Sequence, residues 1–263
     1  MSRLSVTPLG TNGFIPTYGR QTQCYLVRRD RNAFVIDAGT GLGRLLEAPL
    51  AGALAGLERL EILLTHYHLD HTVGLSYLTA FPASLPVRIH APQPPLVDGT
   101  PEALARLISP PLFPLTFPNF PVRVEVVPYS GNELEIAGAT LRLRRQRHAG
   151  GSVGLLIDGR IAHLTDCETE EAAVDFARGA ELLLHEVWVT DEEAAAGAQR
   201  RGHSTVGEVA ALAAAAGVGT LLPMHHHPTR GPADLDDLVA RLAEQTTARV
   251  VLPVEGREYV VGG

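Results

Sequence analysis

Lysine is absent from the 263-residue sequence, so all 22 basic residues are arginine. The formal net charge is −7, and an acidic chain does not attract a nucleic-acid backbone by bulk charge, although a local arginine patch stays open. Only two cysteines occur, Cys24 and Cys167, and their number and spacing exclude both a disulfide framework and a cysteine metal site. We interpret both as small, buried apolar residues.

Long apolar runs are also missing. No stretch approaches the length of a membrane-spanning helix, and residues 1–6 lack the charged-then-apolar pattern of a signal peptide. The composition, 45% hydrophobic and 19% charged, is that of a globular protein with a sizeable core. We therefore expect a cytoplasmic protein with no membrane partner. Because no boundary or repeat is visible, we also expect one domain over residues 1–263.

Residues 61–71, Glu-Ile-Leu-Leu-Thr-His-Tyr-His-Leu-Asp-His, combine an apolar run with a dense group of polar side chains. Ile62 to Leu64 is typical of a buried strand, and His66 and His68 point to one side while the chain stays extended. Asp70 and His71 follow where the chain must turn, so they can face a second point nearby. A chance cluster on a solvated turn is the competing explanation. The density of ligands favours two metal sites, for zinc or else manganese or iron.

Three further candidate ligands, His148, Asp166 and His225, each follow a predicted strand. Taken singly, such residues are more often surface or helix-capping residues. The carboxyl ends of strands gather at one rim of an α/β sandwich, however, so we expect these side chains to join the first cluster. Together they supply the five to six groups that a dinuclear site needs.

The order of predicted elements indicates an α/β fold, a four-layer αβ/βα sandwich with two sheets face to face and helices outside. Residues 82–130 are proline-rich and read either as a linker or as a packed excursion that covers the site; their apolar content favours the excursion. Predicted strands are 4–9, 23–28, 33–37, 62–64, 87–90, 122–127, 133–136, 140–146, 152–157, 160–165, 182–189, 220–224, 249–254 and 259–261. Predicted helices are 42–54, 72–78, 102–108, 205–216 and 233–244.

These residues resemble the five motifs of the metallo-β-lactamase superfamily, in order and across nearly the whole chain. The matching positions are Asp37, His66, His68, Asp70, His71, His148, Asp166 and His225. The resemblance implies two metal sites, one held by His66, His68 and His148 and the other by Asp70, His71 and His225, with Asp166 as the bridge. It also implies that Asp37 orients a ligand. His68 argues against the redox relatives, in which glutamate takes that position.

Two more stretches, His185-Glu186 and His203-Ser204-Thr205, resemble motifs of the ribonuclease Z-like phosphodiesterase branch. The resemblance implies that His203 contacts the scissile phosphate and that Glu186 orients it. The alternatives are a solvated strand end for Glu186 and a helix cap for Ser204 or Thr205. Ribonuclease Z itself carries a long arm that grips transfer RNA between the third and fourth motifs. Here that interval is filled by one tight hairpin, which argues against transfer-RNA processing.

The predicted function is hydrolysis of a small phosphodiester, cyclic or nucleotide, by a hydroxide shared between two divalent metal ions. Asp70 is expected to hold its metal and relay a proton, and His203 to steady the phosphate or protonate the leaving oxygen. Three alternatives stay open: an acyl hydrolase such as a lactonase, thioesterase or β-lactamase, a ribonuclease acting on short RNA, and a metal-binding domain without turnover. The family also implies a homodimer. His226 and His227 are expected at the rim or in solvent.

Overall fold

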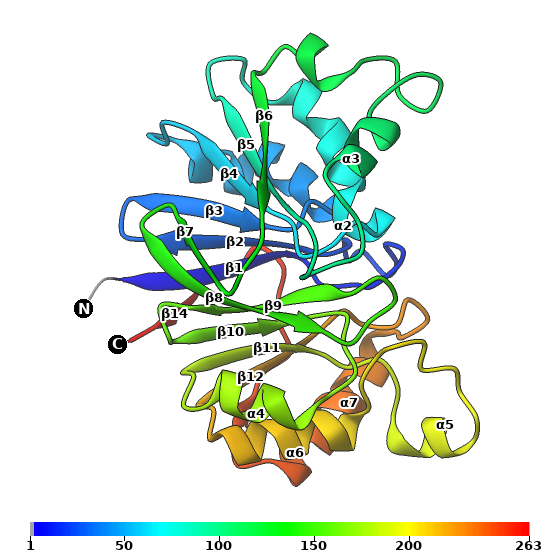
Figure 1. The fold of residues 1–263 in the computed structure, drawn as a ribbon. Coiled ribbons are helices and arrows are strands. Elements are labelled where there is room, and N and C mark those ends of the chain that lie inside the picture. The colour runs from blue at the N-terminus through cyan, green and yellow to red at the C-terminus, as the bar shows by residue number, and fades with distance from the viewer. Residues whose placement is uncertain (1–2, 263) are drawn as a thin grey trace.

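The structure is a computed structural model that describes residues 3–262. Met1, Ser2 and Gly263 lie outside the described residues. The first two of them belong to residues 1–6, for which the sequence analysis found no signal-peptide pattern. Two seven-stranded sheets face each other, with helices on their outer sides (Figure 1). Among the described residues, no helix combines the length and the apolar character that crossing a membrane requires.

The first sheet has the strand order β14-β1-β2-β3-β4-β5-β6. Its strands are β1 (Leu4–Gly10), β2 (Cys24–Arg29), β3 (Asn32–Ile36), β4 (Leu60–Leu63), β5 (Val87–Pro92), β6 (Val124–Tyr129) and β14 (Tyr259–Val261). β1 to β3 are antiparallel, whereas β3 to β6 are parallel. Because β14 pairs with β1, the last strand of the chain lies beside the first (Figure 1).

The second sheet has the order β13-β12-β11-β10-β9-β8-β7. Its strands are β7 (Glu133–Ile136), β8 (Ala139–Gln146), β9 (Ser152–Ile157), β10 (Ile161–Leu164), β11 (Leu182–Glu186), β12 (Thr220–Met224) and β13 (Arg249–Val250). β7 to β10 are antiparallel and β10 to β13 are parallel. The β9–β10 hairpin fills the interval between His148 and Asp166, as the sequence predicted.

Apolar side chains form three layers that account for the sandwich. Phe34, Leu63 and Leu155 belong to a buried cluster between the two sheets, to which both contribute through alternate residues. A second cluster joins the first sheet to Leu42 and Leu75 on its outer helices. A third joins the second sheet to α4, α6 and α7, through side chains that include Phe176, Val209 and Leu238. The predicted four-layer αβ/βα architecture is therefore confirmed.

The helices divide between the two outer faces. Those that follow strands of the first sheet are η1 (Thr40–Leu46), α1 (Ala48–Ala51), η2 (Gly52–Leu54), α2 (Leu69–Thr72), η3 (Val73–Ala80), α3 (Glu102–Leu107) and η4 (Phe117–Asn119). Those that follow strands of the second are α4 (Glu171–Ala177), α5 (Asp191–Ala195), α6 (Val206–Ala216) and α7 (Pro232–Gln245). The single helix predicted over 42–54 is wrong. Glu47 is extended and Pro49 begins a new turn, so the segment breaks into three short pieces.

The proline-rich residues 82–130 are packed rather than a linker. They contain β5, α3 and β6, and Phe113, Phe117 and Phe120 contact the outer core of the first sheet. Gly99 lies against the Tyr67 ring, and the Asp98 amide donates to the Gly150 carbonyl, so part of the excursion reaches the rim where the predicted ligands lie.

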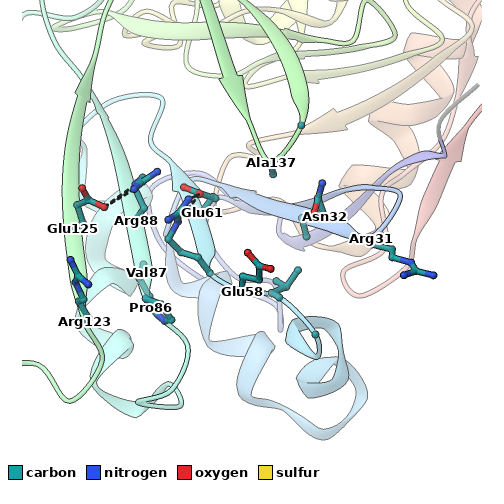
Figure 2. Close-up of a pocket in the computed structure, with 15 residues that line it drawn as sticks. Arg31, Asn32, Glu58, Glu61, Pro86, Val87, Arg88, Arg123, Glu125 and Ala137 are labelled. Atoms are coloured by element: carbon teal, nitrogen blue, oxygen red, sulfur yellow. Dashed lines mark hydrogen bonds and ion pairs between the residues drawn. The ribbon is translucent and has the colours of Figure 1, made fainter.

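A cavity of about 600 Å³ lies at the amino ends of β3 to β6. Figure 2 shows Glu61, Arg88 and Glu125 on the strands and Ala137, at the tip of the β7–β8 hairpin, above them. Four arginines and three glutamates line the cavity, with ion pairs at Arg59–Glu61 and Arg88–Glu125, so it carries no strong charge of one sign. None of the predicted site residues lines it, because those residues follow the opposite, carboxyl ends of the strands.

Candidate metal centre

The histidine motif begins directly after β4, where the chain leaves the sheet. Thr65 anchors this exit, because its amide and hydroxyl donate to the Asp37 carboxylate at 2.7 and 2.8 Å. His66 and His68 then lie with their ring centroids 4.5 Å apart, as the extended spacing predicted. α2 follows at once and turns Asp70 and His71 toward the same region. The Nδ1 atom of His71 lies 2.8 Å from Asp37, which fixes the ring so that Nε2 faces the cluster.

Three of the predicted residues have left-handed backbone conformations. Asp37, Asp166 and His225 have φ values of 57°, 49° and 52°, and each follows the end of a strand within two residues. Non-glycine residues adopt such conformations rarely and at a cost, and they are concentrated at functional sites. Here the unusual backbone turns the side chain off the strand direction, inward over the sheet edge.

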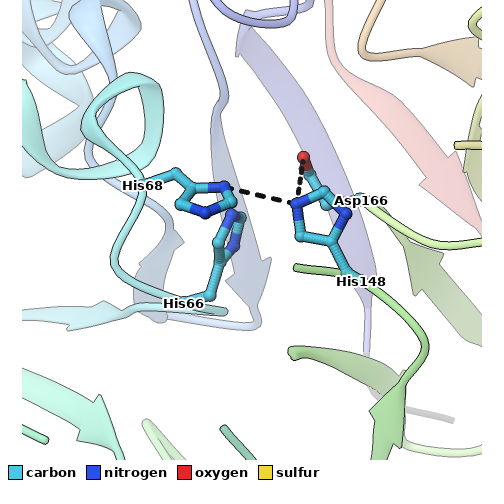
Figure 3. Close-up of side chains that lie close together, drawn as sticks. All are labelled: His66, His68, His148 and Asp166. Carbon is cyan, nitrogen blue, oxygen red and sulfur yellow. Dashed lines mark hydrogen bonds and ion pairs between the residues drawn. The ribbon is translucent and has the colours of Figure 1, made fainter. Parts of the chain in front are cut away.

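A first group of ligands consists of His66, His68, His148 and Asp166, which offer one ligand atom each within 4.8 Å of one another. Figure 3 shows His66 and His68 facing His148 and Asp166 across the gap between the sheets. The Nε2 atom of His148 lies 3.2 Å from Nδ1 of His68 and 3.4 Å from Oδ1 of Asp166. The residues expected to hold the first metal are thus brought together.

A second group consists of Asp70, His71 and His225. Asp70 Oδ2 lies 3.4 Å from Nε2 of both histidines. Asp166 lies between the two groups, because its Oδ1 is 3.4 Å from Nε2 of His148 and 3.2 Å from Nε2 of His225, while its Oδ2 is 3.0 Å from Nε2 of His71. A carboxylate in reach of histidines from both groups is placed where a bridging ligand could lie. All seven predicted ligands therefore converge on one site.

The chemistry of this site fits divalent metal ions. His66 Nε2, His71 Nε2 and both ring nitrogens of His225 are buried and form no hydrogen bond among residues 3–262, although carboxylate oxygens lie 3.0 to 3.4 Å from the Nε2 atoms of His71 and His225. A buried nitrogen without a partner costs free energy, and convergence of several on two carboxylates is explained by a cation between them. Imidazole and carboxylate ligands without thiolate suit zinc, manganese or iron.

The charges within the site support one another. Burial raises the pKa of Asp166, but His225 and His71 outweigh it and hold that pKa well below the usual range. Burial likewise opposes ionisation of Asp70, and His71 and His225 lower its pKa strongly. For His66, burial and the neighbouring His71 lower the pKa, so its ring is neutral. Ionised carboxylates and a neutral His66 are the protonation states in which these groups bind metals. Burial lowers the pKa of His71, but Asp70, Asp166 and Asp37 raise it well above its usual value, so this ring would lose a proton when it binds a metal.

Glu186 and His203 form a buried pair beside the second group. Glu186 ends β11, and its Oε2 lies 2.6 Å from His203 Nδ1, while its Oε1 accepts from the Cys167 amide. Burial lowers the pKa of His203, but the Glu186 charge and hydrogen bond raise it, to about 9. A nitrogen of His203 lies within 4.8 Å of ligand atoms of Asp166 and His225, so the pair adjoins the metal ligands. The solvated strand end considered for Glu186 is wrong, since Glu186 is fully buried.

Trp188 is a neighbour of the site that the sequence motifs did not indicate. Its ring stacks on His203 with centroids 4.4 Å apart and an interplanar angle of 19°, and His227 packs edge-on against it. It is the only tryptophan in the chain, and its position two residues after Glu186 was the available signal. Thr65 was also missed, although its place between Asp37 and the motif histidines pointed to it.

The two histidines after His225 differ in position. His226 was expected at the rim or in solvent, and that expectation is wrong: its side chain is fully buried and its ring nitrogens have no hydrogen-bonding partner in the described chain. The reason is that its amide and carbonyl bond to Thr11 and Gly13, which draws the residue beneath the N-terminal loop. His227 is half-buried at the rim, against Trp188, as expected. Cys24 and Cys167 are buried free thiols, also as expected.

Comparison with known proteins identifies the family. Residues 32–226 match the family model described as a beta-lactamase superfamily domain, and this range contains all of the ligands above. The chain belongs to the metallo-β-lactamase superfamily. A protein named Ribonuclease Z from Mycobacterium bovis (strain BCG / Pasteur 1173P2) is 31% identical over 267 residues, which cover 94% of either chain. The superfamily member described here is accordingly a hydrolase related to proteins of that name.

Solved structures share the fold of this superfamily. The metallo-beta-lactamase fold protein YhfI from Bacillus subtilis matches with a TM-score of 0.77 at 20% identity, over 98% of this chain and 99% of that one. A diphosphatase from the PhnP family matches with a TM-score of 0.71 at 19% identity, over 98% and 97% of the two chains. At these identities the likeness concerns the fold alone.

Proposed function

We propose that this protein is a phosphodiesterase that hydrolyses a small phosphodiester, cyclic or nucleotide, with two divalent metal ions. The observation that carries the proposal is the Glu186–His203 pair beside the seven clustered ligands. An acyl hydrolase on the same ligands would have no need of an oriented histidine at this place. A phosphodiester has a charged phosphate and an alkoxide leaving group, and both are served by such a group.

The ligand roles follow from the geometry. His66, His68 and His148 would hold one ion, Asp70, His71 and His225 the other, and Asp166 would bridge them. Ions at these positions would neutralise the phosphate and activate water for attack. Because the metal ions supply positive charge, the site can bind an anion although the chain is acidic overall. Zinc is the ion that we favour, with manganese and iron as alternatives.

His203 would act on the phosphate through Nε2. Its Nδ1 is engaged by Glu186, and the ring is held flat against Trp188, so Nε2 is the nitrogen left to donate. From there it would hydrogen-bond a phosphate oxygen or hand a proton to the leaving oxygen. Asp70 would hold its ion and carry a proton away from the attacking water. Its Oδ2 is steadied by the Phe14 amide at 2.8 Å.

Short RNA is the second candidate substrate, and the sequence relatives favour it. The relatives named Ribonuclease Z match along almost their whole length, so they have nearly the same size as this chain. The missing long arm therefore does not set this chain apart from them, which removes the argument that was made against transfer-RNA processing. A ribonuclease of this kind would show binding that weakens steeply with salt.

The test is an assay of the purified protein with its metal content measured. Bis-p-nitrophenyl phosphate, p-nitrophenyl phosphate, a lactone and a short single-stranded RNA would be compared, with Asp70→Ala and His203→Ala as variants. Asp237→Ala, an exposed aspartate on α7 that pairs with Arg241, is the matched control. We expect two metal ions per chain and turnover of the diester. Both variants should lose this turnover, and the control variant should keep it.

Other outcomes separate the alternatives. Cleavage of the lactone alone, with His203→Ala unaffected, would mean an acyl hydrolase. Cleavage of RNA at a rate far above that of the chromogenic diester would favour the ribonuclease. Two bound metals without turnover of any ester would indicate the binding domain.

A further inference from the structure

Large apolar side chains are exposed beside the metal ligands rather than buried. Phe14, Ile15 and Leu69 are exposed to 68%, 45% and 59%, and we call these three residues the apolar rim. Phe14 and Ile15 lie on the loop after β1, and Leu69 directly precedes Asp70. Exposed apolar side chains that gather at one place commonly mark a binding surface.

The backbone at Phe14 has a conformation that needs an explanation. Its φ is 65°, and the Ile15 amide donates to the Gly13 carbonyl at 2.8 Å, so residues 13–15 form a γ-turn with a left-handed centre. This turn is rare and strained, and an aromatic residue is poorly suited to it, since glycine or asparagine adopts a positive φ more readily. Strain of this kind persists where the surroundings impose it, often at ligand-binding positions.

The surroundings that impose it are the metal ligands. The Phe14 amide donates to Asp70 Oδ2, and the Gly13 amide donates to the carbonyl of His226. A side chain at Gly13 would lie 2.5 Å from the His225 ring, so the loop packs directly on that ligand. The buried Asn12 fixes the loop from below by donating to Thr17 Oγ1. Phe14 is thus presented rigidly next to Asp70 and is not a side chain on a free loop.

We propose that the apolar rim binds a flat organic ring of the substrate, such as a nucleobase, while the phosphate lies at the metal ligands. This deepens the proposed function and rests on it, because the rim is continuous with the site through the Phe14–Asp70 hydrogen bond. A preformed aromatic face binds any base by stacking, without reading its hydrogen-bonding edge. The substrate is therefore an aromatic phosphodiester, with weak preference among bases.

The test compares ligands that differ only in the ring. Adenosine 5′-monophosphate and ribose 5-phosphate would be titrated calorimetrically into the zinc-loaded protein. Phe14→Asn removes the ring while keeping a residue that tolerates positive φ, Phe14→Tyr keeps a ring, and Leu69→Ala trims the rim. Leu112→Ala, at a side chain exposed to 75% and elsewhere in the chain, is the control.

We expect Phe14→Asn to weaken adenosine 5′-monophosphate at least about fivefold, the lower end of base stacking on an aromatic residue. Leu69→Ala should give a smaller loss, whereas Phe14→Tyr and Leu112→Ala should bind it as the unchanged protein does. Ribose 5-phosphate should bind equally to all five proteins.

Several results would overturn the ring site. These are equal losses for both ligands, no loss for either, equal affinity of the two ligands for the unchanged protein, and failure of both to bind it. Sedimentation of the same proteins adds another: if Phe14→Asn splits a dimer, the rim is a subunit contact. If the diester is hydrolysed but Phe14→Asn binds adenosine 5′-monophosphate as the unchanged protein does, this inference is wrong and the proposed function stands. If Phe14→Asn weakens adenosine 5′-monophosphate but no diester is hydrolysed, the ring site stands and the proposed function is wrong.

Discussion

The buried pair of Glu186 and His203 shows how one carboxylate serves two donors. Its Oε2 lies against His203 Nδ1 and its Oε1 accepts from the Cys167 amide, so both oxygens are engaged in the described chain. A neutral amide in this place offers a single acceptor and can present its NH₂ group to the ring. The orientation of His203 then depends on the charge of Glu186 and on both of its oxygens.

Replacing Glu186 with glutamine should lower kcat for a phosphodiester by about 100-fold, because His203 loses the partner that fixes its tautomer. Metal content should stay the same, since Glu186 is not among the seven ligands. Steady-state kinetics with elemental analysis measures both, and Glu125→Gln, far from the site in an exposed ion pair, is the control. A kcat within twofold of the unchanged protein would rule out the role given to the pair.

Asp37 holds the histidine motif in place through hydrogen bonds. It accepts from the Thr65 amide and hydroxyl and from His71, and it is fully buried. Asp37→Ala should weaken metal binding about 10- to 100-fold and lower the free energy of unfolding by about 2–4 kcal/mol, because three buried donors lose their acceptor. Chelator competition and urea unfolding of the metal-free protein measure the two effects.

Asp37→Asn separates these effects, because asparagine tolerates the left-handed backbone and keeps one acceptor. It should retain more stability than the alanine variant while still binding metal weakly. Metal affinity unchanged in both variants would contradict the orienting role.

At the scale of elements, α6 illustrates how a helix terminus supports the site. Thr205 caps it, accepting from the Glu208 amide while Glu208 accepts from the Thr205 amide, and the Thr205 hydroxyl also reaches Asp191. A helix cap at Thr205 was one of the alternatives that the sequence left open, and the structure shows it as a capping box. Since His203 lies just before the cap, the cap also fixes where His203 enters the site.

Thr205→Ala should lower the free energy of unfolding by about 1–2 kcal/mol, since the cap and the bond to Asp191 are both lost. Thr190→Ala is a matched control, because Thr190 forms the same capping box on α5, a helix of five residues with none buried. Its loss should cost clearly less in urea unfolding, as α5 can fray without exposing core. If Thr190→Ala and Thr205→Ala lower the free energy of unfolding equally, the packing of α6 on the core does not add to the effect of its cap.

At the scale of the whole molecule, the two sheets meet through a contact that includes an ionisable group. His163 on β10 lies edge-on to Tyr25 on β2, with centroids 5.1 Å apart, and its ring nitrogens have no hydrogen-bonding partner within residues 3–262. Burial lowers the pKa of His163 to about 3. The unfolded chain, with a pKa of about 6.5 at this histidine, binds the proton more readily.

His163 should therefore leave the free energy of unfolding unchanged above about pH 6.5 and should lower it as the pH falls toward 3. The reason is that the unfolded state binds a proton at this histidine that the folded state does not bind. His163→Phe removes the histidine that takes up this proton. Below pH 6, the free energy of unfolding of the variant should therefore rise relative to that of the unchanged protein, by up to about 1.4 kcal/mol per pH unit. Urea unfolding of both metal-free proteins at pH 8, 6 and 5 tests this. Parallel pH profiles would contradict it.

Some expectations concern more than the described chain and stay predictions. A single domain over residues 1–263, a cytoplasmic location and a homodimer are of this kind. Metal number and identity, and the catalytic roles of Asp70, His203 and Glu186, belong to the proposed function.

The sequence by itself determined the architecture and the set of candidate ligands. His66, His68, Asp70 and His71 lie within six residues, and their spacing along an extended chain and a turn defines their relative directions locally. The alternation of apolar residues and the turn signals likewise indicated the strands and the sandwich, because both depend on short-range backbone preferences. Errors arose where those preferences compete, as at Pro49, which divides the helix predicted over 42–54.

Only the tertiary structure decided what surrounds the candidate ligands. The stacking of Trp188 on His203, the burial of His226 beneath the N-terminal loop and the anchoring of Phe14 on Asp70 all join segments far apart in the chain. No local pattern encodes such contacts, because they depend on how the two sheets pack and where the loops cross their common edge. The local motif named the ligands, and the packing of two sheets determined what surrounds them.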